Sequence, residues 1–149
     1  ASSNFKMEHL TGASLVNKSK STVSADEALK DAEVIAFYFS AHWCPPCRMF
    51  TPVLADFYEE AKDGKLPLEI IFVSSDRSED ALFSYMDEAH GDWLAVPFDS
   101  PIINQLKQAF SIQGIPTLIV VKKDGTIVTT NGRSDVERKG ISAFKEWSK

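Results

Sequence analysis

The sequence predicts an α/β domain built on a mixed β-sheet with helices on both faces. Two runs, Val34–Phe39 and Leu68–Val73, are continuously apolar and rich in β-branched and aromatic residues, as expected for strands buried on both faces. Between them, apolar residues recur at helical spacing from Phe50 to Ala61. A strand–helix–strand order of this kind favours parallel pairing of the two strands at the centre of a sheet.

Shorter elements are expected around this unit. Upstream, Ser14–Val16 is predicted to be an edge strand and Ala25–Ala32 a short helix. Downstream of the second long strand, either Asp76 or Ser78 can cap a helix that continues to Ala89, with its apolar residues on one face.

The C-terminal third of the sequence predicts two helices and a hairpin. Ser100 is a favourable N-cap followed by proline, which predicts a helix over 101–110. Leu118–Val121 and Ile127–Thr130 flank a Lys-Asp-Gly turn and are predicted to pair as a hairpin. A last helix is expected over 135–147. Together with the strand–helix–strand unit, the hairpin predicts a mixed sheet that is parallel at its centre and has the hairpin at one end.

Length and composition limit the function classes. We expect a single domain over residues 1–149, with 1–9 as a flexible N-terminal extension. The formal net charge of −5 argues against nucleic acid or an anionic membrane surface as partner. The apolar runs are too short to span a bilayer, and no charged-then-apolar segment opens the sequence. We therefore expect a cytoplasmic protein that can also be nuclear.

The two cysteines carry the clearest chemical signal. Cys44 and Cys47 are the only cysteines, and Pro45 and Pro46 separate them where a buried strand meets an amphipathic helix. A helix start has unpaired N–H groups and partial positive charge, which favour the thiolate of a cysteine placed there. We expect Cys44 to be the exposed attacking sulfur. Cys47, one turn into the helix, is expected to face the interior and resolve the mixed disulfide.

Three other interpretations of the pair are weaker. A structural disulfide closing so small a ring would stabilise the fold by only about 2 kcal/mol. A zinc site needs four ligands, and of the three histidines only His42 is near the pair in sequence. An inert buried pair would leave the two intervening prolines without a packing role. Thiol–disulfide exchange without a metal or a bound cofactor remains the prediction.

Three stretches of the sequence carry a family resemblance. They are Phe-Tyr-Phe-Ser-Ala-His-Trp-Cys-Pro-Pro-Cys-Arg-Met-Phe-Thr-Pro over 37–52, Asp92–Phe98, and Ile115–Leu118. In this order they resemble the thioredoxin superfamily, specifically its tryparedoxin and nucleoredoxin branch, and the resemblance extends from about Leu10 to the C-terminus. It implies a thioredoxin-like fold, with a central mixed β-sheet and helices on both faces.

The resemblance also implies a substrate-binding surface around the cysteines. The Ile115–Pro116 peptide bond is expected to be cis and to pack against the pair. The backbone of Ile115 would pair with an extended substrate segment, while Pro116 would keep metal ions away from the thiols. Trp43 would shelter the disulfide, and together with Pro45 and Pro46 it would form part of the docking surface.

One position departs from ordinary thioredoxins. Those proteins carry a buried aspartate beneath the cysteines, and the matching residue here is Tyr38, as is typical of tryparedoxin-like proteins. A buried base for Cys47 is therefore missing, and either Asp76 or a water is left to take its proton. Tyr38 itself is interpreted as a core residue.

By resemblance, the chain is expected to be a protein-disulfide oxidoreductase acting chiefly as a reductase. Its redox-active disulfide would be Cys44–Cys47, and a peroxiredoxin-type peroxidase is one expected substrate. Electrons would come from a glutathione-type thiol or from thioredoxin reductase. The alternative, from another functional class, is a redox-sensitive binding module that regulates a signalling partner, as nucleoredoxins can.

Overall fold

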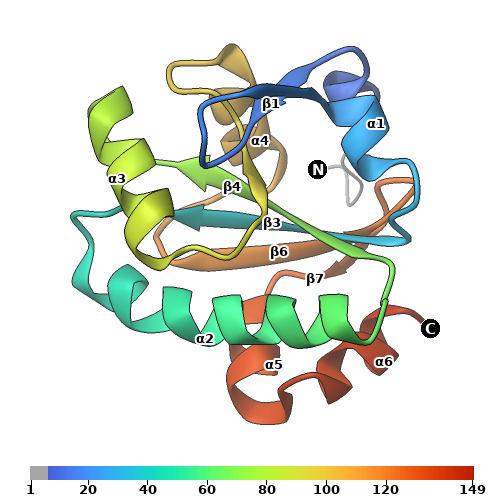
Figure 1. Ribbon diagram of the computed structural model, residues 1–149. Coiled ribbons are helices and arrows are strands. Elements are labelled where there is room, and N and C mark those ends of the chain that lie inside the picture. The colour runs from blue at the N-terminus through green and yellow to red at the C-terminus, as the bar shows by residue number, and fades with distance from the viewer. Residues whose placement is uncertain (1–6) are drawn as a thin grey trace.

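The computed structural model describes residues 7–149, so residues 1–6 of the expected flexible extension lie outside the described residues. A mixed seven-stranded sheet is flanked by helices on both faces, as predicted (Figure 1). The elements in chain order are η1 (Met7–Leu10, a 3-10 helix), β1 (Ser14–Val16), β2 (Thr22–Ser24), α1 (Ala25–Leu29), β3 (Val34–Ser40), α2 (Pro45–Asp63), β4 (Leu68–Ser74), α3 (Glu79–Ala89), β5 (Leu94–Ala95), α4 (Pro101–Ala109), β6 (Thr117–Lys122), β7 (Ile127–Thr129), α5 (Gly132–Lys139) and α6 (Ser142–Trp147).

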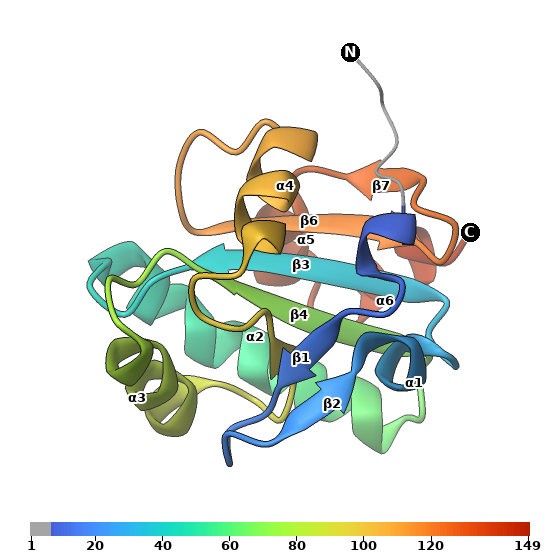
Figure 2. The ribbon, with the colours of Figure 1, turned by 90° about the horizontal axis from the view of Figure 1, so that it is seen from above.

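The strand order is β2-β1-β5-β4-β3-β6-β7. β3 pairs in parallel with β4 and antiparallel with β6, so it lies in the interior of the sheet next to the middle strand β4 (Figure 2). The prediction that Ser14–Val16 is an edge strand is wrong, because β1 lies between β2 and β5. The three-residue β2 is the true edge, and its short polar sequence gives too weak a strand signal to be recognised.

β3 separates two apolar cores because its side chains alternate between the faces of the sheet. Val34, Ala36 and Tyr38 pack with α2, α3, α5 and α6 on one face. Ile35, Phe37 and Phe39 belong to the other core, which η1, α1 and α4 cover. All seven residues of β3 are buried, as its continuous apolar sequence predicts. In the described part of the chain, no helix is both long and apolar enough to cross a membrane.

Of the two predicted candidates for the N-cap of α3, Ser78 is the one that caps it, by accepting a hydrogen bond from the Ala81 amide. The last predicted helix differs from the structure. A single helix was predicted over 135–147, but the structure has two, α5 and α6, and the first begins earlier, at Gly132. They are separated at Gly140, whose φ of +56° does not continue a helix.

Gly132 allows α5 to lie close to β6. A Cβ at this position would lie 2.8 Å from the carbonyl oxygen of Leu118, a backbone atom held in the sheet. Although alanine favours helix by itself, we expect Gly132→Ala to lower the free energy of unfolding by about 1–3 kcal/mol in urea denaturation. Gly114→Ala is the matched control, because a Cβ there meets no atom within 4 Å. Equal effects of the two substitutions would contradict this packing argument.

Candidate active site

Cys44 is the N-cap of α2, at the point where the chain leaves β3. Its Sγ accepts a hydrogen bond from the Cys47 amide at 3.4 Å, while Pro45 and Pro46 occupy the first helical positions and offer no N–H group. The Cys44 sulfur thus faces an N–H donor and the partial positive charge of a helix start. The position of the Cys44 sulfur at the helix start is set by local sequence, since the N-cap, the two prolines and Cys47 are consecutive residues.

Both thiols are free, and they differ only slightly in exposure. Cys47 is completely buried and Cys44 is 5% exposed. The expectation of an exposed Cys44 is therefore wrong in degree, because Ile115 packs against both cysteines and Ala41. Of the two cysteine side chains, only that of Cys44 has surface in contact with solvent.

The Ile115–Pro116 peptide bond is cis, as the resemblance implied. The Ile115 carbonyl oxygen lies 3.9 Å from Cys44 Sγ, within reach of its S–H group. Ile115 itself is half-buried and Pro116 is buried. Residues from the loop before β6 and from the start of α2 thus meet, although about 70 positions separate them in the sequence.

Trp43 lies beside the cysteine pair with half of its surface exposed. Its indole Nε1 donates to the Ser75 carbonyl at 3.0 Å, and the Arg77 guanidinium lies 5.7 Å from the ring centroid. These contacts hold an otherwise exposed aromatic ring in a fixed orientation. Pro45 and Pro46 are also exposed, so the three residues offer one apolar surface next to Cys44.

The protein interior disfavours a charge on Cys47. Burial, together with a hydrogen bond with Cys44, raises the pKa of its thiol to about 11. Asp76, expected as one acceptor for its proton, accepts hydrogen bonds from the His42 amide at 2.7 Å and the Ser74 hydroxyl at 2.7 Å. Its carboxylate organises the loop after β4, and no hydrogen bond joins it to Cys47.

Tyr38 is a core residue, as predicted, and its buried hydroxyl has a hydrogen-bond partner. It lies 2.6 Å from the Thr51 hydroxyl, and Thr51 donates to the Cys47 carbonyl at 2.8 Å. Sequence reasoning missed Thr51, which stands on the apolar face of α2 and is completely buried. The sequence did contain a signal for it: a threonine on the apolar face of a helix, four residues after Cys47, can donate its hydroxyl to the Cys47 carbonyl.

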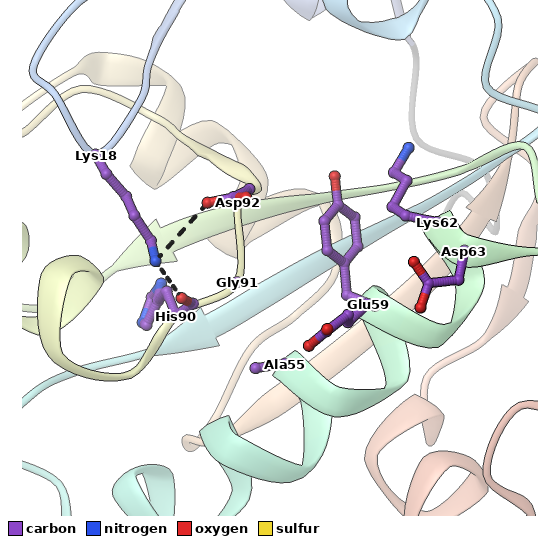
Figure 3. A pocket seen from close by; sticks show the side chains of 9 residues that line it. Lys18, Ala55, Glu59, Lys62, Asp63, His90, Gly91 and Asp92 are labelled. Atoms are coloured by element: carbon purple, nitrogen blue, oxygen red, sulfur yellow. Dashed lines mark hydrogen bonds and ion pairs between the residues drawn. The ribbon is translucent and has the colours of Figure 1, made fainter. Parts of the chain in front are cut away.

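A cavity of about 650 Å³ opens away from the cysteines, beside the second half of α2. At one side of it, the Lys18 ammonium donates to the His90 carbonyl at 2.5 Å and lies 3.9 Å from the Asp92 carboxylate. Figure 3 shows these three residues together. Neither cysteine lines this cavity, so it is separate from the candidate active site. Lys18 there ties the β1–β2 connection to the end of α3.

Comparison with known proteins places this geometry in a family. The family model described as Thioredoxin-like matches residues 31–127. The chain is 45% identical to nucleoredoxin of Bos taurus over 76% of its length, and 37% identical to tryparedoxin of Trypanosoma brucei brucei over 87%. The matched region is 26% of that nucleoredoxin and 88% of that tryparedoxin. The chain thus spans less than a third of the nucleoredoxins it matches.

A solved structure supports the same relationship. The NMR structure of thioredoxin related protein 16 from Carcinoscorpius rotundicauda is 55% identical in sequence and superposes with a TM-score of 0.83. The superposition covers 94% of this chain and 98% of the other. The thioredoxin-like fold implied by the three sequence stretches is therefore confirmed.

Proposed function

The chain belongs to the thioredoxin-like family, with nucleoredoxins and tryparedoxins among its relatives, and from this we propose that it reduces disulfides of other proteins. The observation that carries the proposal is a cysteine at the N-cap of α2 with a second, buried cysteine one turn behind it. Cys44 is the nucleophile and Cys47 the resolving thiol.

The proposed reaction has two exchange steps. The Cys44 thiolate attacks one sulfur of the substrate disulfide, forming a mixed disulfide and releasing the other sulfur as a thiolate that takes up a proton. Cys47 then loses its proton and attacks Cys44 Sγ. This forms the Cys44–Cys47 disulfide and releases the second substrate sulfur as a thiol, so the substrate gains two electrons and two protons.

The surface around Cys44 favours proteins as substrates. Exposed apolar side chains gather on the first turns of α2 and just before it, which suits an apolar protein surface better than a small polar disulfide. They are Trp43, Pro45, Pro46, Met49 and Val53. We propose that a substrate segment lies across them and pairs with the backbone of Ile115. A peroxiredoxin-type peroxidase is one candidate substrate.

Two electron donors are compatible with the site. A cavity of about 320 Å³ lined by Pro116, Thr117 and Arg133 lies next to the candidate active site. We propose a small thiol of the glutathione type as a donor that suits a cavity of this size, in which Arg133 pairs with Glu137, and thioredoxin reductase as the alternative donor. Either donor places the protein in a reducing compartment, and we propose the cytoplasm and also the nucleus.

The test follows NADPH consumption with insulin as the disulfide substrate. Glutathione with its reductase is compared with thioredoxin reductase, and Cys44→Ser is the blank. Turnover with one donor that is absent in the blank is the expected result, and it would also identify the electron source. Absence of turnover with both donors, in protein whose cysteine pair still oxidises and reduces chemically, would refute the reductase.

A redox-sensitive binding module is the second proposal. The similar Carcinoscorpius rotundicauda protein has a role in regulating transcription factor NF-kB activity. In such a module the dithiol state would control association with a signalling partner and turnover would be incidental. Partner binding that is retained in Cys44→Ala but differs between oxidised and reduced wild-type protein would favour this second function.

A further inference from the structure

The large apolar side chains that are exposed in the described part of the chain lie close together in the sequence. They are Trp43, Met49 and Val53, and no two of them are more than ten positions apart. Pro45, which is also exposed, precedes Met49 by four residues, and Val53 follows it by four. Residues four apart share one face of a helix, so Pro45, Met49 and Val53 form an exposed apolar stripe along α2, called here the α2 stripe. The stripe begins next to Cys44.

Met49 differs from the other two methionines in its access to solvent. Met86 is completely buried in the core that α2 covers, and Met7 is half-buried against the core on the other face of the sheet. Met49 is 79% exposed. A small dissolved oxidant therefore meets the Met49 thioether without any opening of the fold.

We propose that Met49 is a site of oxidation by hydroperoxides, and that its sulfoxide weakens the docking of protein substrates without blocking the exchange chemistry of Cys44. This inference rests on the proposed oxidoreductase function, in which the disulfide-bearing segment of a protein substrate lies across the α2 stripe. It adds a chemical modification that changes which disulfides the protein reduces.

The oxidation is a two-electron oxygen transfer. A lone pair of the Met49 thioether sulfur attacks the hydroxyl oxygen of the hydroperoxide. A sulfur–oxygen bond forms as the oxygen–oxygen bond breaks, and the proton of the attacked oxygen passes to the leaving oxygen. The sulfur loses two electrons and becomes a sulfoxide, while the hydroperoxide gains them and leaves as an alcohol, or as water when the oxidant is hydrogen peroxide.

The cysteines do not protect Met49 indefinitely. Cys44 and Cys47 are the only thiols of the chain, and both are consumed when they form their disulfide. No thiol then remains to react with the oxidant. In this oxidised state of the chain, the exposed Met49 sulfur is the most accessible thioether for a hydroperoxide.

Oxidation changes what the α2 stripe can bind. A thioether is apolar and adapts to an apolar partner, whereas a sulfoxide is polar and its oxygen accepts hydrogen bonds. Neither Pro45 nor Val53 carries a side-chain donor for this oxygen. An apolar partner surface that covers Met49 sulfoxide would remove its water and leave the oxygen unpaired, which weakens binding.

The loss depends on the size of the substrate. Met49 lies five residues after Cys44, about 7–8 Å further along the helix axis. A protein segment that reaches Cys44 across the α2 stripe covers both residues. A disulfide of only a few atoms needs contact with Cys44 alone, so its reduction is insensitive to the state of Met49.

The test compares reduction of insulin and of hydroxyethyl disulfide by the reduced chain in single turnover. Hydrogen peroxide is applied to the disulfide state, which protects the cysteines. Catalase removes the peroxide, and dithiothreitol then restores the thiols but not the thioether. Peptide mass spectrometry should place the first added oxygen on Met49. The second-order rate constant should fall about tenfold for insulin and change less than about twofold for hydroxyethyl disulfide.

Three variants assign the effect to Met49. Met49→Leu keeps an apolar side chain but has no sulfur, so its insulin rate should be the same before and after peroxide. Met49→Gln places a polar group on the α2 stripe and should lower the insulin rate without peroxide. Met7→Leu is the matched control on the other face of the sheet, and peroxide should lower its insulin rate as much as that of wild type. Methionine sulfoxide reductases should restore the wild-type rate.

Each outcome has a distinct meaning. Met49 sulfoxide with an unchanged insulin rate would overturn its effect on docking, and oxidation of Met7 or Met86 before Met49 would overturn the assigned site. Equal losses with insulin and hydroxyethyl disulfide would place the damage in the exchange chemistry and also overturn the proposal. An untreated chain that does not reduce insulin would instead refute the proposed function, and this inference with it.

Discussion

Replacement of Cys47 by serine is expected to turn the protein into a trap for its substrates. Cys44 keeps its place at the start of α2 and still attacks, but the chain has no other thiol that could release the mixed disulfide. Intact mass under non-reducing conditions should show about one substrate adduct per chain, removed by dithiothreitol. Turnover of insulin should fall to that of the Cys44→Ser blank.

The reciprocal variant provides the control. Cys44→Ser should form no adduct, because the remaining Cys47 is completely buried behind the position of Cys44. Turnover by Cys47→Ser with glutathione as donor would contradict the two-cysteine mechanism. The released thiol would then come from attack of external glutathione on the mixed disulfide, and Cys47 would not be the resolving residue.

Acid is expected to destabilise the protein through His90. This side chain is buried, its Nδ1 accepts a hydrogen bond from Trp93 Nε1 at 3.0 Å, and its Nε2 has no hydrogen-bond partner among residues 7–149. Burial, helped by the charges of Lys18 and His42, lowers the pKa of His90 to about 3. The folded protein therefore holds this imidazole neutral in conditions where the unfolded chain protonates it.

The sign of the pH dependence follows from that difference. The stability from neutral His90 is fully present above the unfolded pKa of about 6.5 and is lost as the pH falls toward 3. Each pH unit in this window should cost about 1.4 kcal/mol, so lowering the pH to about 5 should remove about 2 kcal/mol of the free energy of unfolding.

Urea denaturation at about pH 7.5 and pH 5 measures this loss. His90→Gln keeps an acceptor for Trp93 but cannot titrate. The variant should be less stable than wild type at the higher pH, yet lose about 2 kcal/mol less on acidification. The same loss in both proteins would assign the acid sensitivity to other groups.

Much of the fold was predictable because its signals are local. The continuous apolar sequence of β3 and β4 and the helical spacing of α2 each arise within a single element, and the structure confirms all three. The placement of β1 was not predictable in this way. β1 is not an edge because it pairs with β2 on one side and with the sequence-distant β5 on the other. The short polar β2 has little strand signal, and the pairing with β5 is a tertiary event.

The sequence alone determined where the cysteine pair lies relative to its helix. A cysteine before two prolines and three residues from a second cysteine must cap a helix with one sulfur and place the other a turn behind it, since helix geometry fixes that spacing. Only the tertiary structure decided which buried hydroxyl groups gather beside Cys47. Ser40 and Tyr85 are 45 residues apart, and their 2.6 Å contact exists because α3 packs on the same face of the sheet as α2. The spacing of residues within one element cannot predict this contact, because the contact depends on how whole helices and strands pack against one another.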